Sequence, residues 1–72
     1  MSEKEKIGLL EEIMDLDADT LSVDSVLTEF EEWDSLAALT FISEMDSRFG
    51  KKITGNQIKD LVTVADAITL MN

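Results

Sequence analysis

The side chains best placed for covalent chemistry are those of Asp34 and Ser35, at the start of a predicted helix. A serine nucleophile needs a neighbouring base, and the chain contains no histidine. With cysteine also absent, a Ser-His triad, a thiolate nucleophile and a zinc site of His or Cys ligands are excluded. Taken alone, Asp34 and Ser35 are good helix-capping residues. We therefore predict that the chain is no enzyme and that other proteins act on it.

The acidic segment after the first predicted helix offers a second possible chemistry, the binding of calcium. Asp15, Asp17 and Asp19 occupy the first, third and fifth positions of an EF-hand loop. The sixth position requires glycine and is Thr20, and the twelfth requires a bidentate glutamate and is Val26. The sequence therefore predicts a solvated acidic loop and no specific metal site.

The first helix is predicted over about residues 3–14. Residues 2–5 read Ser-Glu-Lys-Glu, a capping-box pattern that satisfies free amides at a helix start. Apolar residues then recur at helical spacing, at Ile7, Leu10, Ile13 and Met14. Residues 15–34 lack a sustained period and are predicted to form a long loop, which is unusual in a small domain and often functional.

The clearest helix is predicted over residues 35–49, ended by Gly50 at a left-handed C-cap position. We expect its apolar face to consist of Leu36, Leu39, Ile42, Met45 and Phe49. A short helical piece through Leu61 and a final helix capped by Thr63 complete the pattern, and no segment alternates as a strand does. The predicted fold class is all-α, a small four-helix bundle of three main helices and one short helix, in a single domain over 1–72.

Charge is the strongest compositional signal. The 72 residues include 16 acids and 6 bases, a net charge of -10, and residues 7–47 contain no base. Such a chain repels nucleic acid and anionic lipid, so we expect neither as a partner, and basic protein surfaces are favoured. The absence of cysteine, of a signal peptide and of a long apolar run predicts a cytoplasmic location.

One ordered set of motifs extends over nearly the whole chain. Asp34-Ser35-Leu36 is followed by an amphipathic helix ending in Phe49-Gly50, then by Ile53, and finally by Thr-Val-Ala-Asp-Ala-Ile at 63–68. This set resembles the acyl carrier protein family. In that family the motif serine is esterified by 4'-phosphopantetheine from coenzyme A. The resemblance implies the same modification at Ser35, flanked by Asp34 and Leu36.

The resemblance also implies function and partners. The chain is expected to be a free-standing, monomeric carrier of acyl thioesters. It is expected to be a substrate of a phosphopantetheinyl transferase, and to meet acyl-loading and acyl-transfer or synthase enzymes with basic docking surfaces. A helix start suits the negative phosphodiester, because its amides are unpaired and its dipole end is positive. The residues expected to contact partners are Trp33, Ala37, Thr40, Phe41 and Glu44, with Ala37 and Phe41 exposed. Those expected near an acyl cavity are Leu39, Ile42, Ile53, Ile58, Leu61 and Ile68, each of which also suits plain core packing.

Two departures from the family pattern bear on the pathway. Trp33 stands where many members have a small residue, and its ring is expected to brace the loop or shield the root of the arm. Ala37 and Thr40 stand at positions where members of the family commonly have acidic residues that contact partner proteins. We therefore hypothesise a carrier for one specialised fatty acid or polyketide-type pathway; equal performance with a standard carrier in fatty-acid elongation would refute this. The alternative is an unmodified acidic docking domain with the same helices, in which Ser35 only caps.

Overall fold

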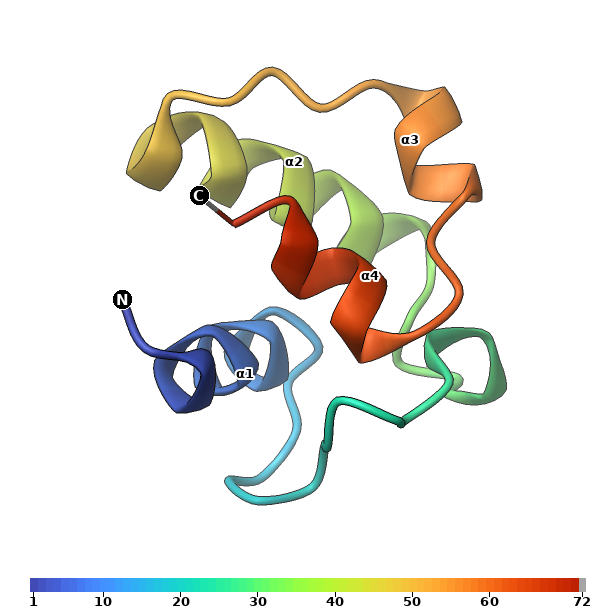
Figure 1. Cartoon of the computed structure of the whole chain (residues 1–72). Helices are drawn as coiled ribbons and strands as arrows, with labels where there is room; N and C mark the ends of the chain where they lie inside the picture. The colour runs from blue at the N-terminus through green and yellow to red at the C-terminus, as the bar shows by residue number, and fades with distance from the viewer. Residues whose placement is uncertain (72) are drawn as a thin grey trace.

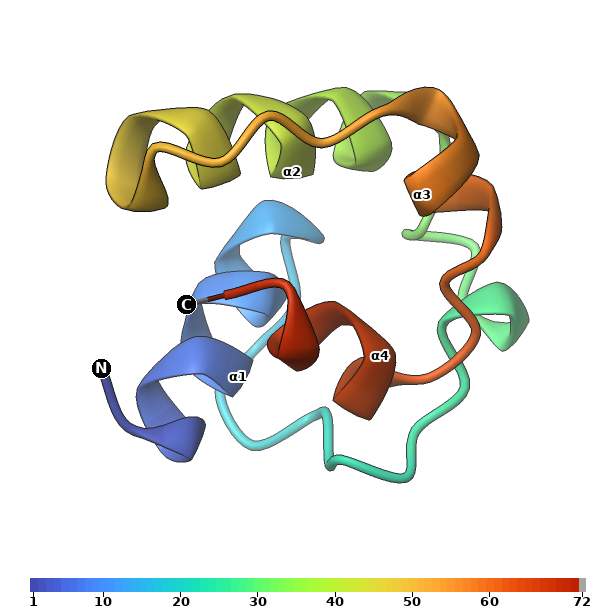
Figure 2. The ribbon, with the colours of Figure 1, turned by 45° about the horizontal axis from the view of Figure 1, so that its top comes forward.

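The computed structural model describes residues 1–71, which form an all-α bundle. Its helices are α1 (Glu3–Ile13), α2 (Ser35–Phe49), α3 (Gly55–Lys59) and α4 (Val64–Thr69), with a 3-10 turn, η1, at Leu27–Glu29. The long α2 lies over α1 and α4, which pack against each other, and α3 stands near the end where α2 begins (Figures 1 and 2). The predicted small four-helix bundle is confirmed.

Each helix begins at a side chain that accepts a hydrogen bond from a backbone amide. Ser2, Asp34, Thr54 and Thr63 are these N-caps, and three of them are completed as capping boxes by a side chain three residues later. At the other end of α2, Gly50 has φ 64° and adopts the predicted left-handed C-cap. The helix starts read from sequence are thus confirmed, because capping is a local interaction.

The start of α4 anchors the long loop. The amide of Leu27 donates to the carbonyl of Val62 at 2.8 Å, and the amide of Val64 donates to that of Ser25 at 2.9 Å. The amides of Thr63 and Val62 also donate to the Asp66 carboxylate, at 3.1 Å each, and hold the pKa of that carboxyl below its ordinary value. The backbone of the predicted loop is therefore fixed at its centre, next to the last helix.

One apolar core joins all the elements. Its side chains come from the helices, the loop and the C-terminal segment, and they are Leu9, Leu10, Met14, Leu21, Leu27, Ala37, Phe41, Met45, Ile53, Leu61, Val64, Ala67 and Met71. Phe41, on the middle of α2, is wholly inaccessible to solvent. Burial of these side chains is the main stabilising term, because a chain without cysteine can form neither a disulfide nor a thiolate metal site.

The face that α2 turns inward matches the predicted one in part: Met45 is buried, and Ile42 and Phe49 pack against the core, as expected. Leu36 and Leu39 were expected in the core, yet they are 72% and 64% exposed. A helix turns by about 100° per residue, so a step of nine residues ends about half a turn away. Leu36 therefore lies on the side of the helix opposite to the buried Met45. Phe41 and Ala37, four and eight residues before Met45, complete the buried stripe in place of the two leucines.

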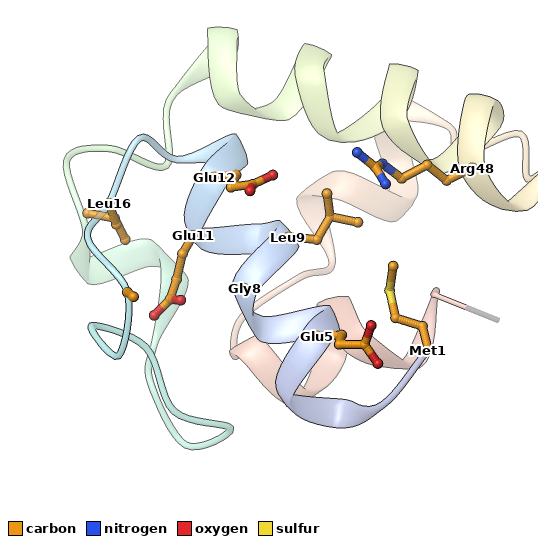
Figure 3. Close-up of a pocket in the computed structure, with 9 residues that line it drawn as sticks. Met1, Glu5, Gly8, Leu9, Glu11, Glu12, Leu16 and Arg48 are labelled. Atoms are coloured by element: carbon orange, nitrogen blue, oxygen red, sulfur yellow. The ribbon is translucent and has the colours of Figure 1, made fainter.

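Glu11 is the one buried charged residue among residues 1–71, and it holds the loop against α1. Its carboxylate accepts a hydrogen bond of 2.9 Å from the amide of Leu21, which is itself in the core. Glu11 and Glu12 leave α1 on different sides (Figure 3). A carboxylate on one side therefore orders the loop, while its neighbour faces solvent.

Glu11→Ala is expected to lower the free energy of unfolding by about 1–3 kcal/mol, because it leaves the buried Leu21 amide without an acceptor. Glu11→Gln keeps an acceptor oxygen and should lose less. Glu12→Ala is the matched control at an exposed neighbour and should stay within about 0.5 kcal/mol of the wild type. Urea denaturation followed by circular dichroism measures all three, and equal effects at both positions would contradict the role given to Glu11.

Candidate functional site

The Ser35 hydroxyl is exposed and makes no hydrogen bond to any of residues 1–71. The capping position belongs to Asp34, whose carboxylate accepts from the Ala37 amide at 3.0 Å. Ser35 is instead the first residue of α2, on the solvent side of the positive end of the helix dipole. Of the two possible capping residues, the structure uses Asp34, and the Ser35 oxygen is available for chemistry.

A shallow depression of about 400 Å³ adjoins Ser35. Its walls come from η1, from the residues before α2, from the first turn of α2, and from α3 and the segment after it. The lining residues are Thr28, Trp33, Asp34, Ser35, Ala38, Ile58, Lys59 and Leu61. The tertiary structure thus brings residues 58–61 beside Ser35, so a group attached there has one wall with both apolar and basic character.

Trp33 is half-buried at the edge of this depression. Its ring lies edge-on to that of Phe41, with centroids 5.8 Å apart and planes at 83°. The ring connects the residue before Asp34 to the centre of the core, a contact that suits the expected bracing of the loop. The same contact holds the backbone next to Ser35.

The exposed side of the first turn of α2 is apolar at its centre and acidic around it. Leu36 shares a small depression of about 200 Å³ with three exposed acids, Asp15, Glu32 and Asp34. Leu39 is one turn further along α2 and also exposed. A large apolar side chain in solvent, surrounded by charge of one sign, is typical of a protein interaction surface.

The residues expected to contact partners fall into two groups. Ala37 and Phe41 are buried, so the expectation that they are exposed is wrong: they carry the four-residue spacing that faces the core. Thr40 is half-buried and its hydroxyl donates to the Leu36 carbonyl at 2.9 Å. Glu44, also half-buried, pairs with Arg48 at 3.0 Å. Trp33, described above, is half-buried as well.

The residues expected near an acyl cavity also separate. Leu39 points into solvent, which is wrong for a cavity residue and follows from the rotation of α2. Ile53 and Leu61 are buried, and the half-buried members Ile42, Ile58 and Ile68 pack against the core. Of the set, Ile58 and Leu61 line the depression beside Ser35. For the others, a role toward an acyl chain stays a prediction.

Another depression, of about 440 Å³, lies between α1 and the last turns of α2 (Figure 3). Glu5, Glu12 and Arg48 are among the residues around it. Arg48 is thirteen residues from Ser35, about 20 Å along α2, so this depression is separate from the serine. Among residues 1–71 no three acidic side chains come together as metal ligands, and this includes the aspartates of the acidic loop.

The sequence analysis missed two features of the site. The buried stripe of α2 was visible as the four-residue spacing Ala37-Phe41-Met45, which competes with the three-residue spacing of the leucines. Lys59 carried no signal at all, because only the packing of α3 beside α2 brings it to Ser35.

No helix within residues 1–71 has the length and apolar composition needed to cross a bilayer.

The family model described as a phosphopantetheine attachment site matches residues 7–71, nearly the whole chain. An acyl carrier protein of Beutenbergia cavernae is 33% identical, over 94% of this chain and 88% of its own length. None of the solved structures matches the chain significantly.

Proposed function

The chain belongs to the acyl carrier protein family of phosphopantetheine attachment domains, and on that premise we propose that Ser35 is its attachment residue. It is a carrier protein and not an enzyme, and its cofactor is covalently attached 4'-phosphopantetheine. The observation that carries the assignment is the unpaired, exposed hydroxyl of Ser35 beside a cap supplied by Asp34. A serine used as the cap would have its oxygen engaged by the helix.

The residues around Ser35 fit a phosphodiester. The first turn of α2 has amides without helical partners, and its dipole favours an anion. Lys59, in the adjoining depression, is the one base among the residues that line it. Against these, Asp34 adds a negative charge, which its capping hydrogen bond with the Ala37 amide partly offsets.

Ser35 cannot activate its own hydroxyl, because the chain has no histidine and no side chain of residues 1–71 accepts its proton. A transferase must supply the base. In the transfer the Ser35 hydroxyl gives its proton to that base, its oxygen forms a bond to phosphorus, the pyrophosphate bond of coenzyme A breaks, and adenosine 3',5'-bisphosphate leaves. Once attached, the arm supplies a terminal thiol that carries acyl groups as thioesters.

The test is the intact mass of the protein after incubation with coenzyme A, magnesium and a phosphopantetheinyl transferase of broad specificity. The expected result is a gain of one phosphopantetheine, located on Ser35 by fragment mass spectrometry. A group found on another serine would refute the assignment while leaving the family intact. No gain with several transferases would favour the alternative, an unmodified acidic domain that binds a basic partner.

Carriers of this family meet phosphopantetheinyl transferases and acyl-processing enzymes. For this chain we propose that they dock over Leu36 and its acidic surround, Asp15, Glu32 and Asp34. The complementary partner surface has an apolar pocket bordered by Lys or Arg, since the chain carries a net charge of -10. The apolar centre also supports our proposal of a specialised pathway, because the first turn of α2 contains no acidic residue.

Leu36→Ala is expected to lower kcat/KM of the transferase about 10-fold or more, because burying a leucine against a partner contributes about 1.5–3 kcal/mol. Stability should not change, since Leu36 already lies 72% in solvent. Val62→Ala is the matched control, an apolar residue 49% exposed outside this surface. Initial rates of modification measure both variants, and an equal loss for Val62→Ala would contradict the proposed surface.

A further inference from the structure

Lys59 occupies an unusual place in this acidic molecule. It is one of six bases, and it lines the depression beside Ser35. The five others stand near the N-terminus or toward and beyond the C-terminal end of α2, and they are Lys4, Lys6, Arg48, Lys51 and Lys52. Lys59 is therefore the one base of the chain that the fold brings to the serine.

The ammonium group of Lys59 is not used elsewhere in the part of the chain that the structure describes. The ion pairs of residues 1–71 join Arg48 to Glu44 and Lys52 to Asp46, and neither includes Lys59. Asp34, the one acid among the residues that line the depression, accepts from the Ala37 amide instead. Lys59 is thus an exposed cation without an anionic partner, in a chain with an excess of carboxylates.

The rest of the same wall is apolar. Trp33, Ala38, Ile58 and Leu61 line the depression together with Lys59, and Ile58 and Lys59 are adjacent at the end of α3. A ligand suited to this wall has an anionic group next to branched, apolar carbons. The phosphodiester of 4'-phosphopantetheine is followed by a dimethyl-substituted carbon, which meets both requirements.

We propose that Lys59 binds the phosphodiester on Ser35 and that the first carbons of the arm lie against Ile58, Leu61 and Trp33. This rests on the proposed attachment at Ser35. The depression then acts as a seat that orients the root of the arm along α3, while its thiol end stays free for partners. An exposed ion pair is weak and screened by salt, so the seat is expected to be occupied for part of the time.

The chain contains a native probe of this seat, because Trp33 is its single tryptophan and lines the depression. The proteins to compare are wild type, Lys59→Ala, Lys59→Arg and Lys4→Ala, each with and without the arm. Lys4→Ala removes the same charge at an exposed position on α1. Intact mass first establishes that each protein is modified, so a failure of the attachment proposal is seen separately from a failure of the seat.

The readouts are Trp33 emission, the ³¹P resonance of the phosphodiester, and nuclear Overhauser effects between the dimethyl protons and Ile58 or Leu61. In the wild type, modification should shift the emission and give these Overhauser effects. Lys59→Ala should reduce the emission shift by half or more and move the ³¹P resonance. Adding about 1 M salt to the modified wild type should have the same two effects, because salt screens the ion pair. Lys59→Arg and Lys4→Ala should resemble the wild type. The proposal would be overturned if Lys59→Ala were fully modified and its Trp33 emission, ³¹P resonance and Overhauser effects were the same as in the modified wild type.

Discussion

Ser35→Ala is expected to abolish covalent loading completely while leaving the fold unchanged. No other hydroxyl stands at the start of α2, and the variant removes the oxygen that would bond to phosphorus. Stability should be retained, because the Ser35 hydroxyl makes no hydrogen bond within residues 1–71 and alanine is the best helix former. Intact mass after incubation with transferase measures the first effect, and thermal unfolding of the unmodified proteins measures the second.

The comparison variant is Asp34→Ala, which removes the cap and keeps the serine. Losing the acceptor of the Ala37 amide should cost about 1 kcal/mol of stability, while Ser35 is still modified, at a lower rate because Asp34 belongs to the proposed docking surface. The two neighbours are therefore expected to separate stability from chemistry. If Ser35→Ala were the destabilising variant and Asp34→Ala the neutral one, Ser35 would be the cap and the proposed attachment would lose its main support.

Phe41→Ala is expected to have the largest effect on stability. The ring is wholly buried on α2 and makes the edge-on contact with Trp33. Truncating a buried phenylalanine costs about 3–5 kcal/mol, through lost transfer free energy and the cavity left behind. A domain of this size has a stability near the lower end of about 5–15 kcal/mol, so much of the variant should be unfolded. Circular dichroism in urea, with Trp33 emission as a second probe, measures this.

Leu39→Ala is the matched control on the same helix. Leu39 lies two residues before Phe41 and is 64% exposed, so its truncation should change the free energy of unfolding by no more than about 0.5 kcal/mol. Comparable losses for the two variants would mean that α2 presents a different face to the core. The pair thus tests the orientation of the helix, on which the Leu36 surface depends.

Much of the fold was predictable because its signals are local. The Ser2 and Thr63 caps and Gly50 each act within a few residues, so the boundaries of α1, α2 and α4 could be read directly. The short helix was also foreseen, although it ends at Lys59 and not at Leu61. Its Thr54 cap closes a box with Gln57 that the sequence reading did not use.

The orientation of α2 was not predictable from its own residues. Apolar side chains at steps of three and at steps of four both fit an amphipathic pattern, and here the two series share Met45 but diverge toward the start of the helix. The tertiary packing buries the residues spaced four apart, because Phe41 fills the centre of the core between α1, α4 and the loop. Leu36 and Leu39 were thereby left in solvent, beside the acids of another segment.

By itself, the sequence determined the all-α class, the helix starts, the excess of acid and the family to which the chain belongs, because each depends on composition or on neighbours along the chain. The tertiary structure decided which residues of α2 are buried, and it left Leu36 and Leu39 in solvent. It also brought Lys59 beside Ser35. These depend on how helices distant in sequence pack around one shared core, a contact between segments that no local pattern encodes.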